Sequence, residues 1–338
     1  MPIIDNAVYV DGKRTPDPTS LSETYDLVKA RQGFGWIGLY RPDPAELQSV
    51  ADEFSLHPLA VEDALEGHQR PKIERYGGDR FVVLRHARYM DTEERVDFGE
   101  VDLFVGRDYV VVVRHAEAPE LQAVRARLEA EPKLLAKGPL AVLYAIADRV
   151  VDDYSPVVNG LENDIDEIED QLFAGDSSVS QRIYELTREV ITFQRAIAPL
   201  AGVLQQLRAE IDGREDLLEV RRGLRDVLDH VTRVQERVEG FRVLLQNALM
   251  VNSTLVGQRQ NDQIEKLTRD AFEQGNQVKK VSSWAAIGFF PGLLASIWGM
   301  NFKNMPELAW PFGYPLALTA MVTLGIVLYV TFRRRNWL

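Results

Sequence analysis

The residues with the clearest chemical potential lie near the C-terminus, in the tripeptide Gly299-Met300-Asn301. The asparagine offers a neutral oxygen that accepts hydrogen bonds, and the glycine lets the backbone turn and present its own carbonyl groups. The tripeptide stands near the end of the first of two stretches that contain no charged residue, 281–302 and 311–332. An asparagine in such a place is also a common way to end a helix. Which interpretation applies depends on the elements around it.

The lengths of the flanking stretches predict those elements. Each stretch has 22 residues, and a helix that rises ~1.5 Å per residue needs roughly 20 residues to cross a ~30 Å hydrocarbon core. Only eight residues separate the stretches, so we expect a membrane hairpin, with the tripeptide at the outer end of its first span. Because lipid would face the open side of two helices, a polar path requires several copies around an axis.

The charges beside the hairpin predict its orientation. Lys279 and Lys280 precede the first span, and the run 333–335 of three arginines follows the second. Basic residues stay on the cytoplasmic side, so both chain ends are expected inside and the loop 303–310 outside. The N-terminal residues lack the charged and apolar regions of a signal peptide. The absence of cysteine excludes disulfides and thiolate metal sites and fits a reducing compartment.

The net charge of −12 is divided unevenly along the chain. Residues 279–338 carry six basic groups and one acidic group, for +5, which leaves −17 for residues 1–278. Such a surface repels nucleic acid and attracts cations, although acidic surfaces also serve solubility alone. No nucleic-acid partner is expected. The chain also lacks the phosphate-binding pattern G-x-x-x-x-G-K-[ST], so ATP is not expected to drive its activity.

Residues 1–117 are predicted to form an α/β domain. Strands are expected at 34–40, 80–90, 101–109 and 109–114, because these runs are rich in β-branched residues and bounded by turn residues. The turn between the last two falls at 106–108. Helices are expected at 43–56, with Asp43 as N-cap and Pro44 in the first turn, and at 57–65.

Residues 118–280 are predicted to be helical, because apolar residues recur there at three- and four-residue spacing. We expect one helix at 141–173, which Pro156 would kink at most, and a second at 180–211. A third helix should begin near Leu217 and continue to Trp298, a length above 100 Å at ~1.5 Å per residue. Helices of this length bundle within a chain or between subunits, and both arrangements remain open.

Three groups of residues now resemble a known family, the CorA magnesium transporters. The first is the C-terminal group: Trp298-Gly299-Met300-Asn301-Phe302, Met305-Pro306-Glu307-Leu308 and the ending Arg333-Arg334-Arg335-Asn336-Trp337-Leu338. The second lies in the predicted α/β domain: His57-Pro58-Leu59, Glu62-Asp63 and His68-Gln69-Arg70-Pro71-Lys72. The third lies in the helical region: Ala147-Asp148, Val151-Asp152-Asp153-Tyr154 and Leu224 to His230. The resemblance covers most of the chain and is weaker before Gly33.

The resemblance implies a complete architecture. The fold would be α+β, with an N-terminal α/β cytoplasmic domain (1–117), a helical domain and stalk helix (118–280) and two C-terminal transmembrane helices, 281–302 and 311–332, joined by the external loop 303–310. The basic tail 333–338 would be cytoplasmic. Five copies would form a funnel-shaped homopentamer in the inner membrane, with a pore lined by the first span. The implied function is passive Mg²⁺ entry, shared by some members with Co²⁺ and Ni²⁺, without catalysis or an organic cofactor.

The pore residues follow from the same resemblance. Five copies of Asn301 would accept hydrogen bonds from the waters that Mg²⁺ sheds reluctantly, with Gly299 and Met300 presenting backbone carbonyls. Glu307 would concentrate cations outside, or would be a loop carboxylate without a role. For the inner ring of asparagines, Asn276 is favoured by its proximity to the membrane, and Asn261 by counting forward from Phe241. The gate is expected around Ile287, Phe290 and Leu294.

The resemblance places regulatory Mg²⁺ between subunits, on Asp63 and Asp226, with Glu62 and Asp148 as secondary ligands. Bound Mg²⁺ would offset the repulsion between acidic subunits and favour the closed pentamer. Each of these acids could instead form an ordinary surface ion pair or cap a helix.

Three other functions remain open. A Zn²⁺ transporter of the same architecture, like the ZntB branch, is the nearest, although Zn²⁺ prefers His and Cys ligands. A membrane-anchored enzyme could use His57, Glu62, Asp63 and His68 as a metal centre, although their spacing matches no recognised ligand pattern. A membrane scaffold that conducts no ions is the third.

Overall fold

The computed structural model describes residues 3–176, 178–300, 302, 305–306 and 310–338. The chain forms two compact units, Met1–Asn252 and Ser253–Leu338. The boundary between them falls inside a single helix, α10 (Leu218–Trp298), which is 81 residues long. The first unit contains all of the predicted segment 1–117 and most of the predicted segment 118–280. The division between these two segments at residue 117 stays a prediction.

The first unit is built on one seven-stranded sheet with the order β2-β1-β3-β7-β6-β5-β4. Strands β3 and β7 are parallel, and every other neighbouring pair is antiparallel. The strands are β1 (Ile3–Val10), β2 (Lys13–Arg14), β3 (Phe34–Tyr40), β4 (Lys72–Tyr76), β5 (Asp79–Met90), β6 (Arg95–Val105) and β7 (Tyr109–Arg114).

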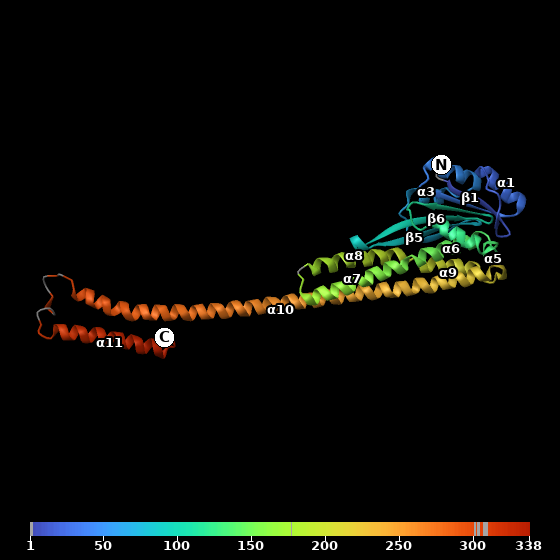
Figure 1. Cartoon of the computed structure of the whole chain (residues 1–338). Coiled ribbons are helices and arrows are strands. Elements are labelled where there is room, and N and C mark those ends of the chain that lie inside the picture. Colours follow the sequence, from blue (N-terminus) through green and yellow to red (C-terminus); the bar gives the residue numbers. More distant parts are fainter. Residues whose placement is uncertain (1–2, 177, 301, 303–304, 307–309) are drawn as a thin grey trace. The chain divides into compact units, whose positions relative to one another are not determined.

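Helices cover both faces of the sheet (Figure 1). The described helices before α10 are α1 (Leu21–Arg31), α2 (Pro44–Phe54), α3 (Pro58–Glu66), α4 (Leu121–Glu129), α5 (Pro132–Leu135), α6 (Pro139–Asp152), α7 (Tyr154–Ala174), α8 (Val179–Ile197) and α9 (Leu200–Glu210). Two short 3₁₀ turns, η1 (Asp91–Glu93) and η2 (Glu215–Leu217), complete the unit.

The two helical layers explain why the sheet is apolar on both sides. Helices α2 and α3 pack on one face around Ile37, Phe81 and Val111, while α6, α7 and α8 contact β5 and β6. The valine run of β7 is therefore fully buried, as in other sheets that are covered on both faces.

Local sequence rules account for several element ends. The side chain of Asp43 accepts a hydrogen bond from the Glu46 N–H, and Glu46 caps the Asp43 N–H in return, which confirms the predicted start of α2. The turn at 106–108 is also confirmed, because the Gly106 N–H bonds to the Tyr109 oxygen at 3.0 Å between antiparallel β6 and β7.

Three predicted elements were wrong in extent. The helix predicted at 141–173 is two helices, α6 and α7, which meet at Asp153. Pro156 has no N–H for the carbonyl of Asp152, and its ring crowds that group, so the helix breaks there. The helix predicted at 180–211 likewise divides into α8 and α9 at Pro199. The strand expected at 101–109 runs instead from Arg95 to Val105, where β6 pairs with β5 over its full length.

The second unit contains the end of α10 and one further helix, α11 (Gly313–Arg334). By length and composition, both helices are apolar enough to cross a membrane. The rings of Trp284 and Tyr329 lie 6.4 Å apart, and Pro291 faces Gly325, so the two helices run antiparallel. Their large apolar side chains are mostly exposed, as lipid-facing surfaces require. Helix α10 ends at Trp298, four residues before the predicted end of the first span, and α11 begins at Gly313, two residues after the predicted start of the second.

Candidate pore helix and cation sites

The predicted pore tripeptide lies where α10 ends. The Gly299 N–H bonds to the Ala295 oxygen at 2.9 Å, and the Met300 N–H to the Ile297 oxygen at 3.3 Å. These bonds close the last turn of the helix. A helix C-terminus carries partial negative charge on its free carbonyl groups, so this end favours a cation. Asn301 and Glu307, the other predicted mouth residues, lie outside the described residues.

The predicted inner pore residues share one side of α10. At about 100° per residue, Asn276, Ile287, Phe290 and Leu294 fall within an arc of about 60°. Asn276 and Phe290 are exposed, while Ile287 and Leu294 are half-buried. The contacts with α11 at Trp284 and Pro291 lie beside this arc rather than on it. A pore role for these four residues stays a prediction.

Asn261 and Asn276 are both exposed on α10. The contacts Trp284–Tyr329 and Pro291–Gly325 fix which levels of the antiparallel helices correspond. Continued to the end of α11, this correspondence brings Arg334 level with about residue 280 of α10. Asn276 therefore lies about one turn beyond the end of the hairpin, and Asn261 about five turns beyond it.

The four predicted regulatory acids fall into two separate groups. Asp63 and Glu62 lie on α3, where the Asp63 carboxylate contacts the Lys72 ammonium at 2.6 Å and Glu62 is exposed. Asp148 lies on α6 and pairs with Arg127 at 2.8 Å. Asp226 lies on α10 with its side chain 69% exposed, and the His230 Nε2 atom lies 3.9 Å from its carboxylate.

Close packing of α6 on α10 brings Asp148 and Asp226 to one surface. A Cβ at Gly223 would lie 2.4 Å from the Tyr144 ring, so only glycine permits this approach. Asp148 and Asp226 both act on Tyr144, whose pKa is raised by burial and by these charges. Burial, followed by Asp148, also raises the pKa of Asp152. Among the described residues of one chain, Asp63 forms no hydrogen bond or ion pair with this surface.

Lys72 holds Asp63 through a shared ammonium. Its Nζ also lies 3.1 Å from the Glu74 carboxylate and 5.8 Å from the centre of the Phe81 ring. Burial lowers the pKa of Lys72, but the hydrogen bonds to Asp63 and Glu74 outweigh burial and the pKa is raised. The ammonium is therefore charged at neutral pH. It forms an ion pair with the carboxylate that the family resemblance assigns to a regulatory metal ion.

A pair of buried acids on β6 was not predicted from the sequence. Asp102 is fully buried, and both its carboxylate oxygens lack a hydrogen-bond partner among the described residues. Glu100 accepts a bond from the Gln69 N–H at 2.7 Å with one oxygen, and its other oxygen is also unpaired. Burial, followed by Glu100, raises the pKa of Asp102 well above its usual value. A proton on Asp102 would satisfy both groups.

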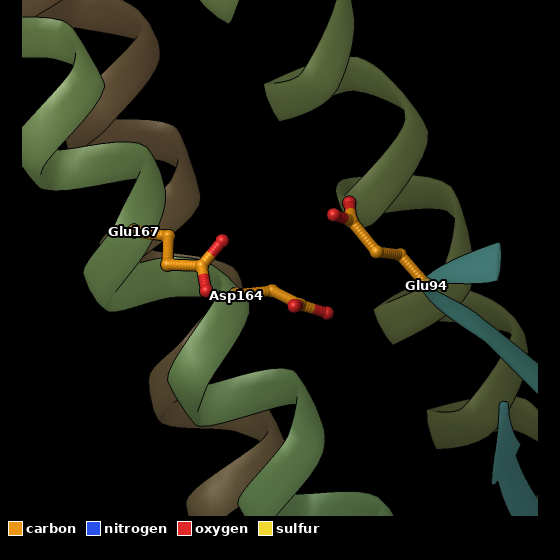
Figure 2. Close-up of side chains that lie close together, drawn as sticks. All are labelled: Glu94, Asp164 and Glu167. Carbon is orange, nitrogen blue, oxygen red and sulfur yellow. The ribbon is translucent and has the colours of Figure 1, made fainter. Parts of the chain in front are cut away.

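One cluster has the spacing of a metal site. Oxygens of Glu94, Asp164 and Glu167 lie within 4.8 Å of one another (Figure 2). The Arg182 guanidinium, however, contacts all three, at 2.9 Å from Glu94, 3.8 Å from Asp164 and 2.6 Å from Glu167. Asp164 also accepts a hydrogen bond from the Tyr89 hydroxyl. The cluster is thus an ion-pair network around arginine, and it is the only such acid group among the described residues.

The two histidines considered for an enzyme metal centre, His57 and His68, do not form one. The His57 ring caps α3 by accepting a hydrogen bond from the Leu59 N–H, and it stacks on Tyr76 at 3.9 Å. His68 is exposed after the end of α3, at a positive φ of 62°. Within the described residues, these two do not form a metal centre with Glu62 and Asp63.

An α+β unit is followed along the chain by two helices that are long and apolar enough to cross a membrane. A family model described as CorA-like Mg²⁺ transporter protein matches residues 31–334. The chain therefore belongs to the CorA family of divalent cation transporters, as the sequence resemblance predicted.

Individual relatives agree with this assignment. The chain is 31% identical over 304 residues to "Putative metal ion transporter YfjQ" of Bacillus subtilis, covering 89% of both chains. It is 29% identical over 309 residues to the cobalt/magnesium transport protein CorA of Thermotoga maritima, covering 90% of this chain and 83% of the relative.

Two solved structures share the fold. The complete CorA magnesium transporter from Methanocaldococcus jannaschii matches with a TM-score of 0.55 at 20% identity, covering 90% of this chain and 92% of that one. The ZntB cytoplasmic domain from Vibrio parahaemolyticus matches with a TM-score of 0.54 at 15% identity, covering 68% and 88%. At these identities the likeness concerns the fold and not the ion.

Proposed function

We propose that this protein is a homopentameric channel for passive Mg²⁺ uptake, closed by Mg²⁺ bound between its cytoplasmic domains. The observation that carries the proposal is that α10, one of two apolar helices long enough to cross a membrane, ends at Trp298, three residues before Asn301. Five copies of this helix end would surround a path whose mouth combines carbonyl groups with neutral amide oxygens. Co²⁺ and Ni²⁺ are expected as further substrates.

The chemistry of the mouth suits a hydrated ion. Mg²⁺ loses its inner waters slowly, and neutral acceptors can bind those waters without holding the ion. The negative end of the α10 dipole adds attraction without a carboxylate. Asn301 would line the mouth with Gly299 and Met300, and Glu307 would raise the local cation concentration. Asn276 is the better inner ring, because it lies about one turn from the hairpin.

The membrane potential supplies the driving force. A divalent ion gains roughly 4.6 kcal/mol per 100 mV on moving to a negative interior, twice the value for a single charge. The basic residues at 279–280 and 333–335 favour both ends of the hairpin on the cytoplasmic side of the inner membrane. The acidic residues 1–278 would then face the cytoplasm, where they can sense the imported ion.

The proposed regulatory Mg²⁺ would bind between acidic side chains that do not contact one another within one chain. Asp63 and Asp226 lie on different elements, α3 and α10, and a cation shared by neighbouring subunits could bridge them. The exposure of Asp226 supports this role, and Glu62 and Asp148 could contribute further oxygens. Loss of the bridging ions would leave the acidic subunits to repel one another and would open the path.

Zn²⁺ is the second candidate substrate, because the ZntB cytoplasmic domain shares the fold. The chain has no cysteine, and its five histidines all precede residue 231, outside both spans. A Zn²⁺ path would therefore use oxygen ligands alone, which Zn²⁺ does not prefer.

Ion flux into liposomes tests the proposed function. We expect Mg²⁺ uptake driven by an inside-negative potential, and a fall of about tenfold or more for Asn301→Ala, because each copy loses a hydrogen bond to the hydrated ion. Asn276→Ala should alter conduction, whereas the matched Asn261→Ala should not. Unchanged Mg²⁺ uptake by the Asn301 variant would refute the pore assignment, and absence of flux for Mg²⁺, Co²⁺, Ni²⁺ and Zn²⁺ would favour a scaffold.

A further inference from the structure

The Asp63 carboxylate, a proposed regulatory ligand, is already neutralised by a cation from its own chain. Lys72 Nζ lies 2.6 Å from Asp63 Oδ2, and both side chains are about three-quarters buried, with 21% and 25% exposed. Such a pair is screened less by water than a surface pair, so the ammonium interacts strongly with this carboxylate. A divalent ion that binds Asp63 must displace the ammonium or bind beside its positive charge.

The pair is formed by neighbouring parts of the chain. Asp63 lies on α3, and Lys72 is the first residue of β4, with only the segment 67–71 between the two elements. The loop that brings them together is short, so its closure costs little entropy. Both positions are fixed by regular structure, α3 packed on the sheet and β4 paired with β5. The fold of the first unit therefore keeps the Lys72 side chain within reach of Asp63.

The structure also provides other partners for the ammonium. Glu74 already contacts it at 3.1 Å. The register pairs Lys72 with Val83, and Val83 with Asp102, so these three residues form one row across β4, β5 and β6 on one face of the sheet. Asp102 is buried and has no hydrogen-bond partner among the described residues. Release from Asp63 would thus leave the ammonium beside two carboxyl groups rather than unpaired.

We propose that Lys72 is a built-in competitor of the divalent cation at Asp63, and that it weakens the regulatory site enough to respond only to high cytoplasmic Mg²⁺. The inference rests on the proposed role of Asp63. A tethered single charge occupies the carboxylate while divalent ions are scarce. A doubly charged ion, held by Asp63 and a neighbouring subunit's acid together, displaces it when its concentration rises. Lys72 thereby sets the Mg²⁺ concentration at which the channel closes.

If Lys72 competes with the metal ion, removing its charged side chain should increase the affinity of the regulatory site for Mg²⁺. For the full-length protein in lipid nanodiscs, Mg²⁺-dependent protection from a protease gives the midpoint of the regulatory response. Lys72→Met should lower this midpoint by about three- to tenfold, because the competing charge next to Asp63 is gone. Lys72→Arg keeps a cation there and should stay near the wild-type midpoint.

A matched control separates competition from a simple change of net charge. Lys29 forms a similar pair with Asp108, 2.7 Å apart and distant from α3 in the sequence. Lys29→Met removes the same charge and should leave the midpoint unchanged. If Lys72→Met fails to fold, as judged by its melting temperature without Mg²⁺, Lys72→Gln replaces it, because its amide can still bond to Asp63 and Glu74.

A double-mutant cycle distinguishes failure of this inference from failure of the proposed function. Asp63→Asn alone should raise the midpoint, and adding Lys72→Met to it should have no further effect, because the two residues act on one site. If Asp63→Asn raises the midpoint but Lys72→Met leaves it unchanged or raises it, the competition is refuted and the sensor stands. If Asp63→Asn changes nothing, Asp63 is not a regulatory ligand, and both ideas fail.

Discussion

At the scale of single residues, neither the burial of an acidic side chain nor its ionic partner can be predicted from the residues beside it in the sequence. Glu100 and Asp102 alternate with valine and leucine in the sequence, a pattern typical of a strand with one face in water. The strand lies inside a sheet covered on both sides, so the acids are buried. Only the tertiary arrangement places Asp102 in one row with Lys72. Asp63 and Asp226 could be named as candidate ligands from the sequence. The ion pair between Asp63 and the Lys72 ammonium could not.

The buried Asp102 predicts a dependence of stability on pH. Because its pKa is raised in the folded protein, the native state binds more protons than the unfolded chain above the ordinary pKa of about 3.8. Its contribution to stability is therefore complete below that pH and is lost as the pH rises towards the folded pKa. The Asp102→Asn amide can donate to Glu100 at every pH, so this loss should disappear.

Melting temperatures between pH 5.5 and 8.5 measure this effect. The wild type should lose stability relative to Asp102→Asn as the pH rises, while Asp26→Asn, a change on the exposed side of α1, should follow the wild type. Parallel curves for wild type and Asp102→Asn would show that no proton is released from Asp102 in this range.

At the scale of elements, the sequence predicted correctly those helices and strands whose signals are local. Strand β3 and the capped start of α2 were predicted correctly, because their signals lie within a few residues of one another. Strand β1 was missed, since Asp5 and Asn6 interrupt its apolar residues and only its pairing with β3 makes it a strand. The break near Pro156 was predicted only as a kink and the break near Pro199 was not predicted, because a proline in a packed bundle can start a new helix direction.

The close approach of α6 and α10 gives a prediction at this scale. Gly223→Ala should destabilise the first unit by about 1–3 kcal/mol, because the added methyl group meets the Tyr144 ring at 2.4 Å. Gly240, on the same helix, has open space at its Cβ, so Gly240→Ala should be neutral or stabilise by up to about 1 kcal/mol.

Urea unfolding of the full-length variants, followed by tryptophan fluorescence, measures both free energies. Equal effects of the two substitutions would mean that Tyr144 moves aside without cost and that the helix contact is loose.

At the scale of the whole molecule, the proposed pentamer would contain about −85 charges in its five copies of residues 1–278, from −17 in each. Repulsion of this kind weakens with ionic strength, because the Debye length falls from about 30 Å at 0.01 M salt to about 3 Å at 1 M. Bound divalent ions and dissolved salt should therefore partly replace one another in keeping the subunits together.

Removal of Mg²⁺ by a chelator tests this expectation. At about 0.02 M KCl, proteolysis of the cytoplasmic segments should accelerate strongly, and at about 0.5 M KCl much less. The wild type with Mg²⁺ present should change little between the two salt concentrations. A chelator effect that is independent of salt would instead indicate that the ions act by specific coordination alone.

The continuity of α10 also limits how this chain can change during evolution. Within the second unit, the part of α10 from Ser253 to Trp298 has no break and ends just before Gly299, so each residue in it fixes the height and the direction of the residues that follow. Insertion of one residue would turn everything beyond it by about 100°, whereas seven residues turn it by only about 20°. Length variation within this part of the helix should therefore occur in whole heptads, each of which lengthens the helix by about 10 Å and keeps the same residues on the same side.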